Sequence, residues 1–370
     1  MQHAQASSFA PLSWLDRWFP VPRLLSPREI GVDISDASVK WMGLVRDPDG
    51  GALVRTFGSK PVPAGAVVGG VIRDERALSG VLAQVREESR ADVAHAALPE
   101  EQAYVFSMHV PDGSTREQTL RLVEFEFEGR VPIPPSTAVY DYDVIQEHTP
   151  EGTQIGVTVF AAEIAAQYAS VFAAAGFELA SLELEARSIG RAIDDDARDA
   201  SVTLLVDFGR ARTGFAVLKG GIPIFTTTVE FGNEEATRRI MEKFDLSEAG
   251  VEVIRNDEGL LASGEHAQIR EEFEKCAVGL AGEIEKYYRF WDTRRDERGE
   301  RVTPVGAVVL VGGSANMKGL VDLIAGKVQA RTERADVWHR VLDPERVLPP
   351  IDKRTSLQFA TAVGLSLRGI

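Results

Sequence analysis

The stretch IGVDISDASVKWMGLVRDPDGGALVRTF, residues 30–57, is repeated in plan by LLVDFGRARTGFAVLKGGIPIFTTTV, residues 204–229. Each stretch begins with an apolar run that ends in an aspartate, Asp33 or Asp207, followed by a short turn of small or polar residues. A second apolar run, a glycine pair and a third, alternating run come next. Apolar runs bounded by Gly, Asp and Ser are typical of strands joined by tight turns. The duplication therefore predicts two three-stranded meanders in two related lobes, with an aspartate from each facing a cleft between them.

The composition fits a large folded chain with an acidic surface. With 370 residues, 44% of them apolar, the chain is long enough for two or more domains. Its formal net charge of −15 argues against a nucleic-acid backbone as the main partner. The single cysteine, Cys276, rules out an intramolecular disulfide framework, and the helical spacing around it predicts a core position rather than a nucleophile. No run reaches the roughly 20 apolar residues that a membrane-spanning helix needs.

Residues 1–27 include SSFAPLSWLDRWFPVPRLL, a stretch crowded with Trp, Phe and Leu. Prolines on both sides limit any helix in this stretch to about residues 12–19. Aromatic side chains favour the headgroup boundary of a bilayer, which suggests a short interfacial anchor. The alternative, an arm that packs on the body of the protein or is partly disordered, is favoured by the scarcity of Lys and Arg.

Between and after the meanders, the sequence alternates between strand-like and helix-like periodicity. A helix after the capping residue Ser114 or Thr115 contains LRLVEFEFE, which alternates like a strand, but capping, charge and length favour a helix. The predicted strands cover residues 93–99, 104–111, 138–144, 155–161, 179–185 and 307–313. The predicted helices cover residues 75–89, 115–129, 162–175, 186–193, 233–244, 247–254, 267–292, 317–330 and 357–367.

These elements predict two lobes and a small insertion. The arm of residues 1–27 precedes the first part of the first lobe, residues 28–91. A compact α+β block at residues 92–160 interrupts this lobe, which continues over residues 161–200. The second lobe, with a helical insertion, covers residues 201–356, and residues 357–370 form a C-terminal helix that packs on the first lobe.

Three turns of small residues follow strands: DISDASVK (33–40), DFGRARTG (207–214) and VGGSANMKGL (311–320). Turns rich in Gly and Ser leave backbone N–H groups free to bind an anion. A carboxylate beside such a turn is able to hold hydrated Mg²⁺, which keeps several of its waters. Gly312 and Gly313 would let a ligand approach the backbone closely. The alternative is that all three are ordinary strand connections.

In this order, the turns resemble the two phosphate loops and the adenosine loop of the actin-like ATPase superfamily. Within it, the chain is similar to the PilM family of type IV pilus assembly proteins. GVDISDASVK resembles the family's opening, LPEEQAYVFSMHVP and EFEGRVPIPPSTAVYDYDVI its inserted subdomain, VDFGRARTGFAVLKGGIPIFTTTVEFGNEEATRRI and VVLVGGSANMKGLVDLI its second half, and FATAVGLSLRG its last helix. The resemblance covers about residues 29–370. It implies an α/β fold, actin-like (ribonuclease H-like) and two-lobed, with a small inserted α+β subdomain.

The resemblance also implies that ATP and Mg²⁺ bind between the lobes. The first phosphate loop would contribute Asp33, Ser35, Ser38 and Lys40, and the second Asp207, Gly209 and Thr213. The adenosine loop would contribute Gly312, Gly313, Ser314 and Lys318, while Glu252 and Arg255 would border the base. Asp33 and Asp207 would hold Mg²⁺ through water, and Glu185 occupies the position that orients the attacking water in this superfamily.

Some residues depart from the superfamily pattern. Ser35 stands where stronger ATPases have glycine, Arg210 and Arg212 are bulky for the second phosphate loop, and Arg255 replaces a lysine. Phosphoryl transfer depends on positioning and charge neutralisation, which a bulkier loop would disturb first. We therefore expect slow or absent ATP hydrolysis with nucleotide binding retained.

As a function, the resemblance implies a cytoplasmic scaffold peripheral to the inner face of the cytoplasmic membrane. Its expected partner is the cytoplasmic N-terminal peptide of a PilN-like inner-membrane protein, bound between the inserted subdomain and the first lobe. Pilus motor ATPases and further copies of the chain are additional expected partners; nucleic acid is not. Two alternatives stay open: an FtsA-like membrane-associated division protein, which would carry a membrane-targeting helix after GLSLRG, and a small-molecule kinase of the superfamily, whose sugar pocket cannot be identified here.

Overall fold

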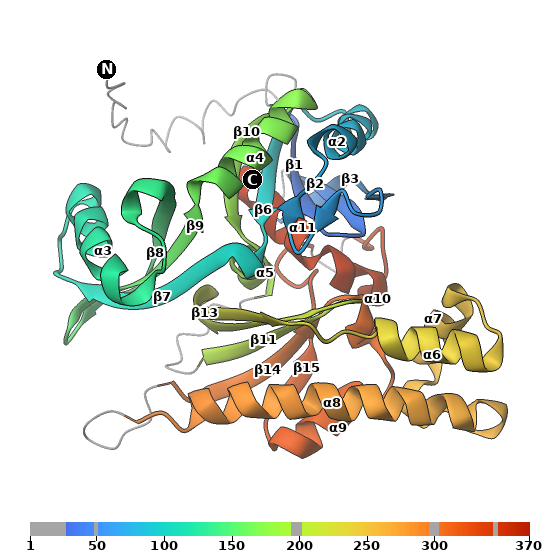
Figure 1. Ribbon diagram of the computed structural model, residues 1–370. Coiled ribbons are helices and arrows are strands. Elements are labelled where there is room, and N and C mark those ends of the chain that lie inside the picture. The colour runs from blue at the N-terminus through green and yellow to red at the C-terminus, as the bar shows by residue number, and fades with distance from the viewer. Residues whose placement is uncertain (1–26, 48–50, 194–201, 296–302, 343–346) are drawn as a thin grey trace.

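The computed structural model describes residues 27–47, 51–193, 202–295, 303–342 and 347–370 (Figure 1). In them, two five-stranded sheets form the two lobes, and a three-stranded sheet forms a subdomain beside them. The aromatic stretch within residues 1–26, with its two interpretations, lies outside the described residues. No helix in the described part of the chain combines the length and the hydropathy required to cross a membrane.

The first lobe is built on the predicted meander. Its sheet has the order β10-β6-β1-β2-β3, in which β1, β2 and β3 pair antiparallel while β6 runs parallel to both β1 and β10. The strands are β1 (Glu29–Ile34), β2 (Ser38–Arg46), β3 (Ala52–Pro61), β6 (Val93–Leu98) and β10 (Glu178–Leu184). Helices α2 (Glu75–Ser89), α4 (Ala162–Ala174), α5 (Glu185–Ile193) and α11 (Ala360–Ser366) pack around it. The predicted meander is confirmed.

The second lobe repeats this plan, which confirms the second meander. Its sheet has the order β13-β12-β11-β14-β15, with β11, β12 and β13 antiparallel and β14 parallel to β11. The strands are β11 (Val202–Phe208), β12 (Thr213–Lys219), β13 (Ile222–Val229), β14 (Val305–Val311) and β15 (Thr332–Arg334). The helices are α6 (Glu234–Phe244), α7 (Glu248–Asp257), α8 (Ala267–Asp292) and α9 (Leu320–Val328); α8 runs along the outer side of the lobe (Figure 1).

The inserted subdomain has a core of its own. Its sheet has the order β7-β9-β8, formed by β7 (Ala103–Val110), β8 (Ala138–Thr149) and β9 (Gly152–Ala161). Helix α3 (Arg116–Arg130) covers one face and buries Val123 and Phe127 against Ile155 and Val157. Thr115 accepts a hydrogen bond from the Gln118 N–H and so begins the helix, whose predicted helical state is confirmed.

Some boundaries differ from those predicted. The block expected at residues 92–160 opens with β6, which belongs to the first-lobe sheet because its continuous apolar run is buried between β1 and β10. The helix predicted at 317–330 begins only at Leu320, because Gly319 has a φ of 84° that ends the preceding turn. The helix predicted at 357–367 consists of α11 flanked by 3₁₀ turns. The short elements β4 (Val67–Val68), β5 (Val71–Ile72), β15 and α10 (Lys353–Ser356) were not predicted.

The C-terminal helix α11 packs closely on β1 and α5. A Cβ added at Gly31 would lie 2.3 Å from the Ala362 carbonyl oxygen, and one added at Gly364 would lie 1.8 Å from that of Ser188. The Ser366 hydroxyl also accepts a hydrogen bond of 3.0 Å from the Gly31 N–H. These contacts fix β1, which ends at the cleft between the lobes, and α5, which begins there.

Candidate functional site

A cavity of about 1220 Å³ lies between the two lobes. All three turns singled out in the sequence contribute to its wall, since each follows the carboxyl end of a central strand. The predicted site residues that line it are Asp33, Ser35, Ser38, Lys40, Glu185, Asp207, Gly209, Glu252, Arg255, Gly312, Gly313 and Ser314. The fold thus gathers in one cavity residues that lie up to 281 positions apart, from Asp33 to Ser314 (314 − 33).

The first turn is held by its own serines. The Ser35 N–H donates to the Ser38 carbonyl at 2.9 Å, and the Ser38 N–H donates to the Ser35 hydroxyl at 3.1 Å. Lys40 Nζ donates to the Ser38 hydroxyl at 3.0 Å. These bonds leave the N–H groups of Asp36 and Ala37 without an acceptor among the described residues. Both are therefore free to donate to a bound anion.

The second turn is closed in the same way. The Gly209 N–H donates to the Arg212 carbonyl at 3.0 Å, and a Cβ at Gly209 would lie 2.8 Å from that oxygen. Only glycine therefore fits this turn without a shift. The Ser314 hydroxyl donates to the Gly209 carbonyl at 3.0 Å, which ties the third turn to the second. In the described part of the chain, the N–H groups of Arg210 and Ala211 have no acceptor.

The third turn brings its backbone against the second-lobe aspartate. Gly312 has a φ of 86°, and a Cβ there would lie 2.4 Å from Asp207 Oδ1 and 2.6 Å from the Phe208 carbonyl oxygen. A side chain at Gly312 would thus displace the carboxylate that faces the cavity. Glycine is required here both by conformation and by space.

Buried carboxylates dominate the middle of the cavity. Burial raises the pKa of Asp33, which Lys40 partly offsets, and burial followed by the charge of Asp33 raises the pKa of Asp207 to about 6. Burial, again with the charge of Asp33, raises the pKa of Glu185 well above its usual value. Burial and then the charge of Asp207 raise the pKa of Glu100 to about 8. These carboxyl groups are destabilised in their charged form because they lie together with little positive charge.

The donor set fits a hydrated cation. Asp33, Asp207 and Glu185 accept no side-chain or backbone hydrogen bond from the residues that the structure describes, so their oxygens are available to water or metal. No group of three His, Cys, Asp or Glu side chains in the described ranges is placed to hold a metal ion directly. A few carboxylates with open positions for water suit Mg²⁺, which retains most of its hydration shell.

The other end of the cavity contains an arginine from α7. Arg255 is 8% exposed, and its Nη2 lies 3.3 Å from Glu252 Oε1 and 3.4 Å from the Gly313 carbonyl oxygen. Burial lowers the pKa of Arg255, an effect that the charge of Glu252 opposes. Glu252 and Arg255, which were predicted to border the base, therefore form an ion pair one turn apart on α7. Arg255 also contacts the third turn.

Two predicted site residues do not line the cavity. Thr213 is fully buried, and its hydroxyl donates to the Phe231 carbonyl at 2.6 Å. The backbone of Lys318 packs on Gly259, and its carbonyl accepts a hydrogen bond from the Leu260 N–H at 2.9 Å. Both residues shape the turns rather than the cavity wall. Neither Thr213 nor Lys318 lines the cavity, and their contact with a nucleotide stays a prediction.

Sequence reasoning missed Glu100. Its Oε1 accepts a hydrogen bond of 2.9 Å from the Ala186 N–H at the start of α5, and the residue lines the cavity. The sequence carried a signal for it, because Glu100 follows a buried apolar run, VAHAALP, as Asp33 and Asp207 follow theirs. The conformation that turns its carboxylate into the cleft depends on α5, which is distant in sequence.

Comparison of the structure with solved structures places it among actin-like proteins. The structure of a PilM-PilN type IV pilus biogenesis complex matches with a TM-score of 0.74 and 20% identity, covering 92% of this chain and 98% of that one. The ethanolamine utilization protein EutJ from Carboxydothermus hydrogenoformans matches with a TM-score of 0.53 and 17% identity, covering 94% and 91%. MreB5 of Spiroplasma citri, bound to AMPPNP, matches with a TM-score of 0.50 and 12% identity, covering 93% and 96%. At these identities the matches show the fold, and they confirm the predicted actin-like architecture.

Sequence comparison identifies the family. No curated protein matches the chain. The family model described as type IV pilus assembly protein PilM matches residues 31–370, which include both lobes and the inserted subdomain. This match favours a pilus assembly protein over the two alternatives, an FtsA-like division protein and a small-molecule kinase. The chain belongs to the PilM family of type IV pilus assembly proteins.

Proposed function

We propose that this protein is an ATP-binding scaffold of the type IV pilus inner-membrane assembly complex, and that it docks the cytoplasmic tail of a PilN-like membrane protein. The observation that carries the nucleotide half is the cavity itself: N–H groups of two turns and the carboxylates of Asp33, Asp207 and Glu185, none of which has a hydrogen-bond partner among the described residues, face one space. MreB5, which shares the fold, is bound to AMPPNP in one structure and to ADP in another.

The two ends of the cavity differ in a way that suits a nucleotide. Arg255, which contacts the third turn, would border the adenosine. The N–H groups of the first and second turns would receive the phosphates. Lys40 adds a positive charge beside the first turn. Mg²⁺, when bound through water to Asp33 and Asp207, would supply the charge that lets phosphates approach these carboxylates. Glu185, at the start of α5, lines the cavity and would orient a water molecule there.

Isothermal titration of Mg²⁺-ATP into the wild type and Asp207→Ala tests this half of the proposal. We expect the wild type to bind and Asp207→Ala to lose at least about tenfold in affinity, the effect of one lost charge interaction. Asp322→Ala, at an acidic residue in the first turn of α9 that does not line the cavity, is the matched control and should bind as the wild type does. Unchanged affinity in Asp207→Ala, or no binding by the wild type, would overturn the assignment.

Turnover is expected to be slow. The second turn carries Arg210 and Arg212, whose side chains are engaged with acidic residues, and the first turn carries Ser35 in place of a glycine. Phosphate release should fall well below the enzyme median of about 10 s⁻¹. A turnover near that median, abolished by Glu185→Gln, would show that these departures do not impair hydrolysis.

The docking half of the proposal rests on the inserted subdomain. Strand β8 lies at one edge of its sheet, and Val139 and Val144 on that strand are 41% and 45% exposed. An extended peptide would add to such an edge as a further strand, and a short helical one would lie between the inserted subdomain and the first lobe. The related structure with a TM-score of 0.74 is a complex of PilM with PilN. Recruitment to the inner face of the membrane would then depend on the partner.

Deletion of the subdomain tests the docking. Because Ala103 pairs with Phe160, residues 103–161 can be replaced by a short Gly-Ser linker without separating the ends of the first lobe. This deletion should abolish co-sedimentation with vesicles that contain the partner, whereas deletion of residues 1–27 should weaken it modestly. Val144→Asp should weaken recruitment, and Val278→Asp on α8, with 61% exposure, is the control. The docking proposal fails if the protein sediments equally well with partner-free vesicles and loses this only without residues 1–27.

A further inference from the structure

Arg212 joins three segments that are far apart in the sequence. From the second turn of the second lobe, its Nη1 donates to Glu101 Oε1 at 2.5 Å, and its Nη2 pairs with Asp36 Oδ2 in the first turn of the first lobe. Glu101 lies in the 3₁₀ turn (Glu100–Gln102) between β6 and β7, where the chain enters the inserted subdomain. The Arg212 side chain is 23% exposed and lines the cavity.

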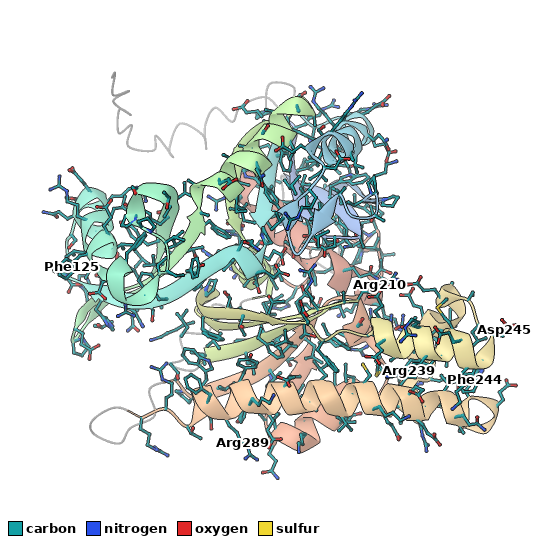
Figure 2. All side chains as sticks on the ribbon, viewed as in Figure 1. Phe125, Arg210, Arg239, Phe244, Asp245 and Arg289 are labelled. Carbon is teal, nitrogen blue, oxygen red and sulfur yellow. The ribbon has the colours of Figure 1, made fainter. Side chains whose placement is uncertain are left out.

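The other arginine of the same turn, Arg210, has different partners. Arg210 forms ion pairs with Glu234 at 3.0 Å and Glu248 at 2.6 Å, within the second lobe, and lies on the α6 side of the molecule (Figure 2). That side also holds Arg255, which marks the proposed adenosine end. Arg212 instead pairs with Asp36 of the first turn, whose N–H groups, with those of the second turn, would receive the phosphates.

We propose that Arg212 is the residue by which this cavity distinguishes ATP from ADP. This inference rests on the proposed nucleotide binding and assigns the terminal phosphate to one side chain. A guanidinium forms paired hydrogen bonds with phosphate oxygens as it does with carboxylates, so the phosphate and the two acids compete for the same donors.

The partners of Arg212 are not equally dependent on it. Asp36 also accepts hydrogen bonds from the Gly69 and Gly70 N–H groups, at 3.1 and 3.2 Å, and keeps these if Arg212 moves. Glu101 has Arg212 as its only hydrogen-bond or ion-pair partner among the described residues. If Arg212 turns to phosphate, Asp36 therefore stays satisfied by its backbone donors, whereas Glu101 loses the partner that restrains its segment.

The surrounding charges strengthen the discrimination. Asp36 and Glu101 lie beside Arg212, and Glu100 and Asp207 add carboxyl groups in the middle of the cavity, while Lys40 supplies positive charge beside the first turn. Without Arg212, the additional negative charge of ATP would meet these acids unscreened. The affinity for ADP, which lacks the last phosphate, would decrease much less. Removal of Arg212 should thus lower the affinity for ATP more than the affinity for ADP.

The test is isothermal titration of ATP and of ADP, each with Mg²⁺, into the wild type and two substituted forms of the full chain. In Arg212→Gln, the ratio of ATP to ADP affinity should fall about tenfold, the size expected for a charge-assisted hydrogen bond. Arg212→Lys keeps the charge without the paired donors, and its affinity ratio should lie between those of the wild type and Arg212→Gln. Arg331→Gln, an exposed arginine paired only locally with Glu333, is the control and should leave the ratio unchanged. Thermal melting verifies that each variant is folded.

Hydrogen exchange supplies a second readout, independent of affinity. In the wild type, hydrogen exchange in the segment that contains Glu101 should be faster with ATP than with ADP. In Arg212→Gln, the same segment should exchange at the faster rate even without nucleotide. If the wild type binds both nucleotides and the ratio stays within about twofold in Arg212→Gln, or falls equally for both, the inference is wrong while nucleotide binding stands. If the wild type binds neither nucleotide, the proposed function itself fails, and the inference fails with it.

Discussion

Arg187 on α5 forms a two-pronged ion pair with Asp143 on β8, with Nε–Oδ2 at 2.9 Å and Nη2–Oδ1 at 3.2 Å. The remaining guanidinium nitrogen, Nη1, donates to the Gly221 carbonyl in the β12–β13 turn at 3.5 Å. One side chain thus connects the first lobe, the inserted subdomain and the second lobe. Because α5 begins with Glu185 in the cavity, the proposed docking subdomain and the proposed nucleotide site share one rigid helix.

This contact should show measurable coupling. A double-mutant cycle with Arg187→Ala and Asp143→Ala, followed by urea unfolding, should give a coupling energy of up to about 1 kcal/mol, because Asp143 is partly solvated and screened. The coupling should decrease as salt is added. The more exposed pair Arg121–Glu117 on α3 is the reference and should give a smaller coupling energy. Equal coupling in both pairs would mean that the bridge does not hold the subdomain in place.

Two helical glycines should respond in opposite ways to alanine. Gly364→Ala places a methyl group against the Ser188 backbone and should lower the free energy of unfolding by about 3 kcal/mol, because α11 and α5 must separate. Gly326→Ala on α9 meets no atom within 4 Å and should raise it by about 0.5–1 kcal/mol. Urea denaturation compares both with the wild type. If Gly364→Ala were neutral, the close packing of the C-terminal helix on the first lobe would be incorrect.

The buried carboxylate of Glu183 should contribute to stability at neutral pH. Burial by itself would raise its pKa, but hydrogen bonds and charges of Arg191 and Arg368 lower it overall. Glu183→Gln leaves both arginines without their anion and should cost about 3 kcal/mol at pH 7. Since the folded-state pKa is lowered, this contribution should disappear as the pH falls below about 4. Urea unfolding at pH 7 and pH 3 measures the change; a penalty that persists undiminished at pH 3 contradicts the electrostatic assignment.

The buried acid Glu100 should make the protein less stable as the pH rises, the opposite of the effect of Glu183. Burial raises the pKa of Glu100 from its usual 4.5 to about 8 in the folded protein, so between these pH values the folded state keeps a proton that the unfolded state has released. The stability from this proton is fully present below the unfolded pKa and is lost as the pH rises through 8. One such proton changes the free energy of unfolding by at most about 1.4 kcal/mol per pH unit.

Glu100→Gln, which cannot ionise, tests this dependence. In metal-free buffer, the wild type should lose stability between pH 5 and pH 8 relative to Glu100→Gln. Glu117→Gln, at an exposed acid on α3, should follow the wild type. Parallel curves for wild type and Glu100→Gln would show that Glu100 is ionised in the folded protein at neutral pH.

The sequence predicted the elements well because their signals are local. Alternating apolar residues and glycine turns are enough to place β1, β2, β11 and β12, and Thr115 with Gln118 marks the start of α3. The boundary of the inserted subdomain was harder, since β6 is a buried strand whose partners are distant in sequence: Val93 pairs with Glu29, 64 positions before it, and with Glu178, 85 positions after it. Which sheet a strand joins is a property of the assembled fold.

The sequence by itself determined the two meanders, the aspartate at the end of each first strand and the three turns that surround the cavity. Each of these depends on residues within a few positions, where backbone conformation and burial pattern set the free energy. Only the tertiary structure decided which side chains meet across the cleft. The pairing of Arg212 with Asp36, 176 positions apart, and the capping of α5 by Glu100 depend on how the lobes pack. No local pattern specifies that packing, because it results from the summed burial of both sheets, the helices and the C-terminal segment.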